Sequence, residues 1–286
     1  AHYSTGRREI IEATLCEAHN AICLATTLHV AWFVRALCLN TPQLAKYDDA
    51  LDGFLELTGR SGLSSDLSRI VMREIANVPA ALSNKPPGRH VQEAVKAQGW
   101  LMKNEENDRR RMSAATDHMQ MIVQKLKDPV KAFEAGEDLM RFSGDYWGKD
   151  KSLHSQASLY ERYLMIGTIP GVEYDEVVRR FLTHLDQVTL ERRMVGWSRI
   201  AHYYRFAKRP REAAEAYKSA VDCFRHLIGA EIPQSDIEVH KFGIEAVTRL
   251  VEVSMDLGDS PAALAVGNEF LPISSDSVAE KYHYGD

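Results

Sequence analysis

Helical periodicity runs through almost the whole sequence and limits its fold more than any other feature. Apolar residues recur at spacings of three and four, whereas sustained alternation of apolar and polar residues, the mark of a half-buried strand, is not found. Proline and glycine punctuate the helical segments. The sequence therefore predicts an all-α chain of roughly ten helices joined by short turns.

Helix-breaking residues predict where the helices begin and end. Residues 7–39 are predicted to form one long helix, and residues 144–149 a loop. The strongest break, at residues 83–88 (Ser-Asn-Lys-Pro-Pro-Gly), predicts a boundary between an N-terminal helical region, 1–88, and a second region, 89–286. Other helices are expected over residues 48–57, 65–76, 90–126, 128–142, 153–166 and 175–188.

A charged run lies inside the helix expected over residues 90–126. Glu105 and Glu106 stand four residues before Arg109 and Arg110, the spacing at which acidic and basic side chains pair along a helix. This spacing predicts a solvated helix whose acids neutralise its arginines, rather than a nucleic-acid-binding patch.

Net charge and hydropathy exclude two classes of protein. A net charge of -5 and a pI of about 6.1 argue against a general nucleic-acid binder, which carries a basic excess. The most apolar stretch, residues 21–34, is followed directly by Arg35. It is shorter than the about twenty residues that a membrane span requires, so we expect a buried helix there and no membrane span.

The cysteines predict the cellular compartment. Cys16, Cys23, Cys38 and Cys223 show neither CxxC spacing nor a nearby histidine pair for zinc. Because Cys16 and Cys23 are seven residues apart, they share a helix face and are predicted to be small core residues. A reduced, cytoplasmic setting is therefore expected. Ala1 in place of an initiating Met is consistent with a fragment or a processed form.

Residues 197–220 carry the most specific pattern in the chain. Two helices are predicted there, each with one packing face at helical spacing and a basic turn at residues 208–211 between them. Small side chains on these faces allow a close approach, and aromatic side chains fill the remaining space. The positions are Trp197, Ile200, Ala201 and Tyr204 on the first helix, and Ala213, Tyr217 and Ala220 on the second.

This pattern resembles the tetratricopeptide (TPR) repeat family, with Ile200 and Ala201 in place of the family's Leu and Gly. Two looser copies, residues 126–139 (LKDPVKAFEAGEDL) and 257–270 (LGDSPAALAVGNEF), align without a gap, and no copy is recognised before Pro86. The resemblance implies antiparallel helical hairpins stacked as an α-solenoid. It also implies a groove that binds a protein or peptide.

By this resemblance, a ligand lies on the first helix of each pair. Off the packing face, Ser198, His202 and Arg205 lie one turn apart, and Glu252 belongs to the corresponding set of the later copy. Arg209, in the basic turn, suits an acidic peptide or a phosphate. We therefore expect these five residues to bind the partner, with no catalytic residue, metal or cofactor.

Two alternatives remain open. Asp48, Asp49 and Asp52 match the DDxxD string by which terpene and prenyl-diphosphate synthases, also all-α, hold magnesium and diphosphate. No NDxxSxxxE string follows, so a polar helix start, favoured by the helix dipole, is the preferred interpretation. The other alternative is a structural oligomer in which the Trp197 face packs on a sister chain.

Overall fold

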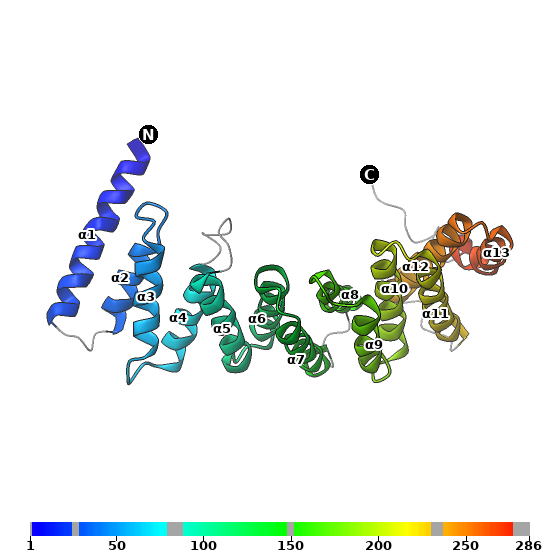
Figure 1. Cartoon of the computed structure of the whole chain (residues 1–286), viewed down its shortest axis with the longest axis horizontal. Coiled ribbons are helices and arrows are strands. Elements are labelled where there is room, and N and C mark those ends of the chain that lie inside the picture. Colours follow the sequence, from blue (N-terminus) through cyan, green and yellow to red (C-terminus); the bar gives the residue numbers. More distant parts are fainter. Residues whose placement is uncertain (1, 25–28, 79–87, 148–151, 230–236, 277–286) are drawn as a thin grey trace. The chain divides into compact units, whose positions relative to one another are not determined.

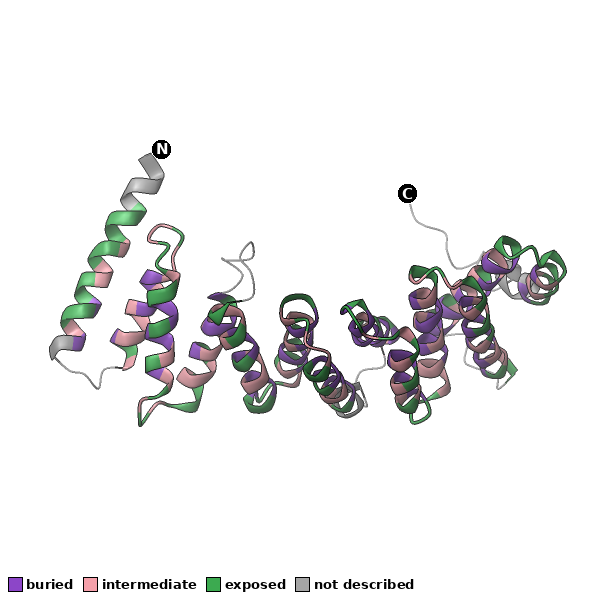
Figure 2. Cartoon of the chain, viewed as in Figure 1, coloured by how far each residue is buried: buried purple, intermediate pink, exposed green. Residues whose placement is uncertain are grey.

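Every regular element in the described parts of the chain is helical. The computed structural model describes residues 2–24, 29–78, 88–147, 152–229 and 237–276. These parts hold thirteen α-helices and no strand, which confirms the all-α class (Figure 1). On most helices, buried residues form a stripe and exposed residues lie on the opposite side (Figure 2), as expected for amphipathic helices.

The chain divides into two compact units, Ala1–Ala135 and Gly136–Asp286, called here the N-terminal and C-terminal units. The division lies elsewhere than the boundary expected at residue 88. The physical reason is that α4 (Ser65–Asn77) and α5 (Arg89–Asn104), on either side of the Pro-Pro-Gly segment, pack against each other. Most of that segment, residues 79–87, lies outside the described residues.

In the N-terminal unit, each helix from α1 to α5 contacts the next one along the chain. A close approach brings Gly53 against Ala36, where an added Cβ would lie 3.2 Å from the alanine Cβ. Phe54 and Leu57 are fully buried beside this contact. The remaining helices are α1 (His2–Leu24), α2 (His29–Leu39), α3 (Tyr47–Thr58), α6 (Asp108–Met121), the π-helix η2 (Ile122–Leu126) and the start of α7 (Pro129–Trp147).

The C-terminal unit is built around α10, which contacts α8, α9, α11 and α12. Tyr160 and Tyr163 pack on Phe181, with ring centroids 5.0 and 5.4 Å apart. Burial raises the pKa of Tyr160 to about 12. The helices are α8 (Leu153–Leu164), the 3₁₀ helix η3 (Met165–Thr168), α9 (Tyr174–Leu185), α10 (Leu190–Phe206), α11 (Pro210–Gly229), α12 (Ile237–Asp256) and α13 (Ser260–Asp276).

Three sequence-based boundaries were wrong. The helix expected over residues 7–39 is two helices, α1 and α2, that contact each other; residues 25–28 between them lie outside the described residues. The helix expected over residues 90–126 breaks at Glu105, whose backbone is extended (ψ 131°). The loop expected from residue 144 lies partly within α7, which continues to Trp147.

Cys16, expected in the core, is exposed.

Helices α10 and α11 pack as the spacing of residues 197–220 predicts. Ile200, Ala201, Ala213, Tyr217 and Ala220 have no exposed surface. The two large aromatic residues of α10 in the same pattern, Trp197 and Tyr204, are only half-buried. The small residues therefore set the approach of the two helices, and Tyr217 is the aromatic side chain that fills the interior.

The same helix–turn–helix geometry recurs at three places. In each, a residue with positive φ ends the first helix, and five residues later a buried alanine lies in the second helix. The alanine N–H donates to the carbonyl of the residue that follows the positive-φ position. The pairs are Lys127 (φ 54°) with Ala132, Lys208 (φ 57°) with Ala213, and Gly258 (φ 79°) with Ala263.

A fourth occurrence lies in the N-terminal unit, where the sequence showed no copy. Ala45 has φ 51°, and the N–H of fully buried Ala50 donates to the Lys46 carbonyl. Residues four and seven positions after each buried alanine lie on the same helix face. These are Phe54 and Leu57, Gly136 and Leu139, Tyr217 and Ala220, and Gly267 and Phe270. All of them except half-buried Gly267 are buried.

We expect Lys208→Gly to raise the free energy of unfolding by about 0.5 kcal/mol. A side chain in the left-handed region costs roughly 1 kcal/mol or more, and the added freedom of glycine in the unfolded chain offsets part of the gain. Gly258→Ala should lower the free energy of unfolding by about 1 kcal/mol, because it places a side chain in the left-handed region. Urea denaturation followed by circular dichroism measures both changes.

Lys218→Gly is the matched control, because Lys218 is exposed in the interior of α11. This substitution should lower the free energy of unfolding by about 1 kcal/mol. Equal losses for Lys208→Gly and Lys218→Gly would show that the turn holds no left-handed strain.

Candidate binding face

The five residues expected to bind a partner lie in the C-terminal unit. Ser198, His202 and Arg205 belong to α10, Glu252 belongs to α12, and Arg209 directly precedes α11. Helix α10 contacts both α8 and α12, so alternate helices of the chain lie side by side here. The structure brings three of the five residues together and separates the other two.

Arg205 and Glu252 meet between α10 and α12. Their charged atoms are 3.6 Å apart, and Arg249, one turn before Glu252, binds the same carboxylate at 2.8 Å. About two fifths of each of these three side chains is exposed. The two guanidinium groups and the carboxylate are therefore held near each other and remain open to water.

His202 lies one turn before Arg205 and also points toward α12. Its Nε2 is 3.9 Å from a Glu245 carboxylate oxygen, and its ring meets the buried Tyr217 ring edge to face at 5.8 Å. Burial lowers the pKa of His202, and Arg199, Arg249 and Arg205 lower it further, while Glu245 opposes them. The imidazole is therefore neutral at neutral pH, with one nitrogen able to donate and one able to accept a hydrogen bond.

Ser198 does not lie on this open face, contrary to expectation. Its exposed fraction is 6%, and its hydroxyl has no hydrogen-bond partner among the described residues. The reason is that α10 is contacted by four helices, α8, α9, α11 and α12, which leave few of its positions open. Its neighbour Arg199, which the sequence did not single out, binds Glu161 of α8 at 2.9 Å and lies over the Phe242 ring of α12.

Arg209 points to a different neighbour. It donates to Asp175 of α9 and to Glu212 at 2.8 Å each, and its guanidinium covers the Tyr204 ring. The hydrogen bonds to Asp175 and Glu212 raise the pKa of Arg209. This arginine ties the α10–α11 turn to α9, and both acids neutralise its charge.

The aspartates of the DDxxD string face bases of α5. Asp48 pairs with His90, and Asp52 pairs with Arg89 at 2.5 Å. Within the described ranges, no three side chains of the metal-binding kinds come together. The two outer carboxylates of the string are thus directed to cationic partners.

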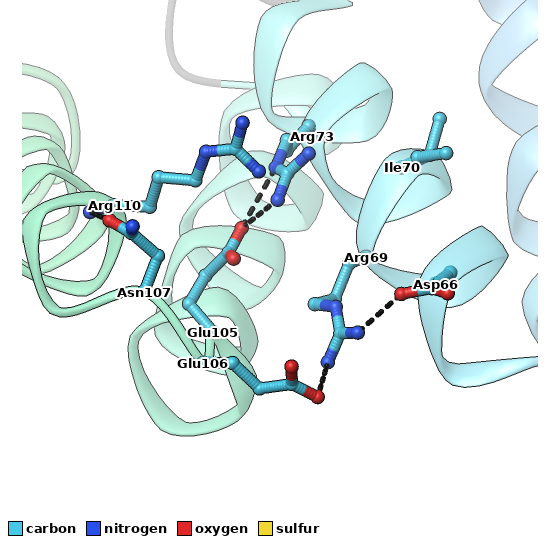
Figure 3. A pocket seen from close by; sticks show the side chains of 8 residues that line it. All are labelled: Asp66, Arg69, Ile70, Arg73, Glu105, Glu106, Asn107 and Arg110. Carbon is cyan, nitrogen blue, oxygen red and sulfur yellow. Dashed lines mark hydrogen bonds and ion pairs between the residues drawn. The ribbon is translucent and has the colours of Figure 1, made fainter.

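A cluster of charges in the N-terminal unit was misread from the sequence. Glu105, 4% exposed, accepts hydrogen bonds from Nε and Nη2 of Arg73 at 2.8 and 2.5 Å (Figure 3). Glu106 pairs with Arg69 at 2.8 Å. Both acids thus bind arginines of α4, not Arg109 and Arg110 as expected. Because the helix breaks at Glu105, the i,i+4 geometry required for the expected pairs does not form.

Comparison with protein-family models and with curated proteins gives no match. No helix in the described ranges is both long enough and apolar enough to cross a membrane.

Proposed function

We propose that this protein is a non-enzymatic, TPR-like α-solenoid module that binds a protein or peptide segment through α10 and α12. The observation that carries the proposal is the row of half-exposed charged and polar groups on adjacent alternate helices, with Arg205 and His202 facing Glu252 and Glu245. The recurring helix–turn–helix geometry around positive-φ residues supports a repeat architecture.

The ion pairs on this face are suited to exchange with a ligand. Ion pairs this exposed contribute between about 0 and 1 kcal/mol. A bound segment can therefore replace one partner at little cost. Because arginines and glutamates alternate here, the complementary segment carries both signs of charge, and neutral His202 can hydrogen-bond its backbone.

Exposed apolar residues at the ends of these helices offer an anchor for the same segment. Phe206, the last residue of α10, is 90% exposed, and Met255, near the end of α12, is 54% exposed. Aromatic and methionine side chains are enriched at protein interfaces. A ligand with mixed charges and an apolar residue fits these features best.

The proposed setting is the cytoplasm. Cys38 and Cys223 are free and buried, and burial raises the pKa of each thiol. Buried free thiols that remain protonated suit a reducing compartment.

Peptides selected from a random display library against the immobilised chain test the proposal. We expect His202→Ala/Arg205→Ala to weaken a selected peptide about tenfold, because two polar contacts are lost. The matched control is Arg211→Ala/His226→Ala, which removes the same residue types from exposed positions of α11. Equal affinity for the two double variants, with both folded by circular dichroism, would rule out the α10–α12 face.

A further inference from the structure

Two adjoining clefts in the N-terminal unit have volumes of about 320 and 340 Å³ and share Arg73, Glu105 and Arg110 in their walls. In Figure 3 the Arg110 side chain extends from α6 and points toward the Arg73 guanidinium on α4. Two cations directed to one place repel each other, weakly here because Arg110 is exposed to water, and an anion between them removes this repulsion. Glu105 supplies one such charge, and it is already bound to Arg73.

Arg110 has no hydrogen-bond or ion-pair partner for its side chain among the described residues, although it lies beside several acids. Glu105 and Glu106 are engaged by arginines of α4. Arg110 also lies in the first turn of α6, where Asn107 caps the helix by accepting from the Arg110 N–H at 3.1 Å. A helix N-terminus disfavours cations and favours anions, so both the unpaired guanidinium and the helix dipole attract a negative group.

We propose that Arg73 and Arg110 form a binding site for a phosphate group at the junction of these clefts. Arg73 uses Nε and Nη2 to hold one Glu105 oxygen, so Nη1 remains for a ligand, and Arg110 offers its whole guanidinium fork. A phosphate group carries close to two negative charges at neutral pH, which matches two arginines better than a single carboxylate does.

The second cleft adds neutral polar groups and one acid, Asp117, beside the arginines. Asn77, Gln98 and Ser113 line it, and their amides and hydroxyl can donate to phosphate oxygens or to the group that bears the phosphate. Its volume admits a phosphorylated side chain as well as a free ion. The site is independent of the α10–α12 face.

Titration of the ¹⁵N-labelled full chain with blocked phosphoserine (N-acetyl-phosphoserine amide), and separately with inorganic phosphate, tests this site by NMR. Saturable shifts are expected at the Arg73 and Arg110 side-chain N–H signals and at Asn107. Tighter binding of phosphoserine identifies a phosphorylated protein as the source of the bound phosphate group. Tighter or equal binding of inorganic phosphate identifies the free ion as the ligand. Blocked serine should cause no saturable shift.

Arg110→Gln should weaken binding about tenfold, because a charge-assisted contact is lost while the side chain makes no other described contact. Arg109→Gln is the matched control: Arg109 is an exposed neighbour in the same helix turn and lines neither cleft. It should change the affinity less than about twofold, since only distant charge is removed. Absence of saturation with both ligands, or equal weakening by the two variants, overturns the proposal.

Discussion

Phe224→Ala is expected to lower the free energy of unfolding by about 4 kcal/mol, which is typical for a buried phenylalanine. Phe224 of α11 has no exposed surface and stacks on Phe270 of α13, with ring centroids 5.7 Å apart. On another side of the Phe224 ring, Gly243 of α12 lies so close that an added Cβ would be 2.3 Å from the ring. Truncation therefore opens a cavity among three helices. Urea denaturation of the full chain measures the loss.

Phe206→Ala controls for the chemistry of the substitution, because Phe206 is 90% exposed. It should change the free energy of unfolding by less than about 0.5 kcal/mol. Gly243→Ala alone should cost about 2 kcal/mol by overpacking. In the Phe224→Ala background it should instead stabilise by up to about 1 kcal/mol, since alanine favours the helix and the methyl group enters the cavity. Additive losses would contradict this packing.

Arg73→Met is expected to lower the free energy of unfolding by about 3 kcal/mol. It leaves the Glu105 carboxylate, 4% exposed, without its cationic partner. Loss of one member of a buried pair typically costs 3–5 kcal/mol, and we take the lower end because a third of the Arg73 side chain is exposed. Chemical denaturation at low and high salt measures the effect, which should change little with ionic strength.

Arg69→Met is the control, one turn earlier on the same helix. Arg69 binds Asp66 and Glu106, whose side chains are 82% and 81% exposed, so its loss should cost less than about 1 kcal/mol. The double variant Arg73→Met/Glu105→Leu should recover most of the stability, because an apolar pair carries no buried charge. Failure of the double variant to recover would show that Arg73 stabilises the fold by something other than its pairing with Glu105.

Local patterns along the chain were enough to predict the all-α class and one hairpin. The spacing of Ile200, Ala201, Ala213 and Tyr217 depends only on the helical repeat, and these residues are buried as expected. The fourth helix–turn–helix in the N-terminal unit escaped notice because its positive-φ residue is Ala45, and alanine gives no turn signal. Only backbone geometry reveals that occurrence.

The candidate sites were harder to predict because tertiary contacts decide which polar residues are exposed. Ser198 is one residue from Arg199, yet packing of neighbouring helices buries the serine and directs the arginine to Glu161. Glu105 was predicted to lie on a solvated helix, because Arg109 stands four residues later. Arg73, which is the actual partner, is 32 residues away in the chain, and no local pattern connects the two.

The most extensive helix contacts join segments that follow one another along the chain, such as α1 with α2, α5 with α6, and α10 with α11. Chains dominated by contacts of short sequence separation reach the native state quickly, because little loop entropy is lost before contacts form. Folding can therefore begin at hairpins whose two helices are neighbours in the chain. A ribosome-bound chain could bury much of each hairpin before the next one is synthesised.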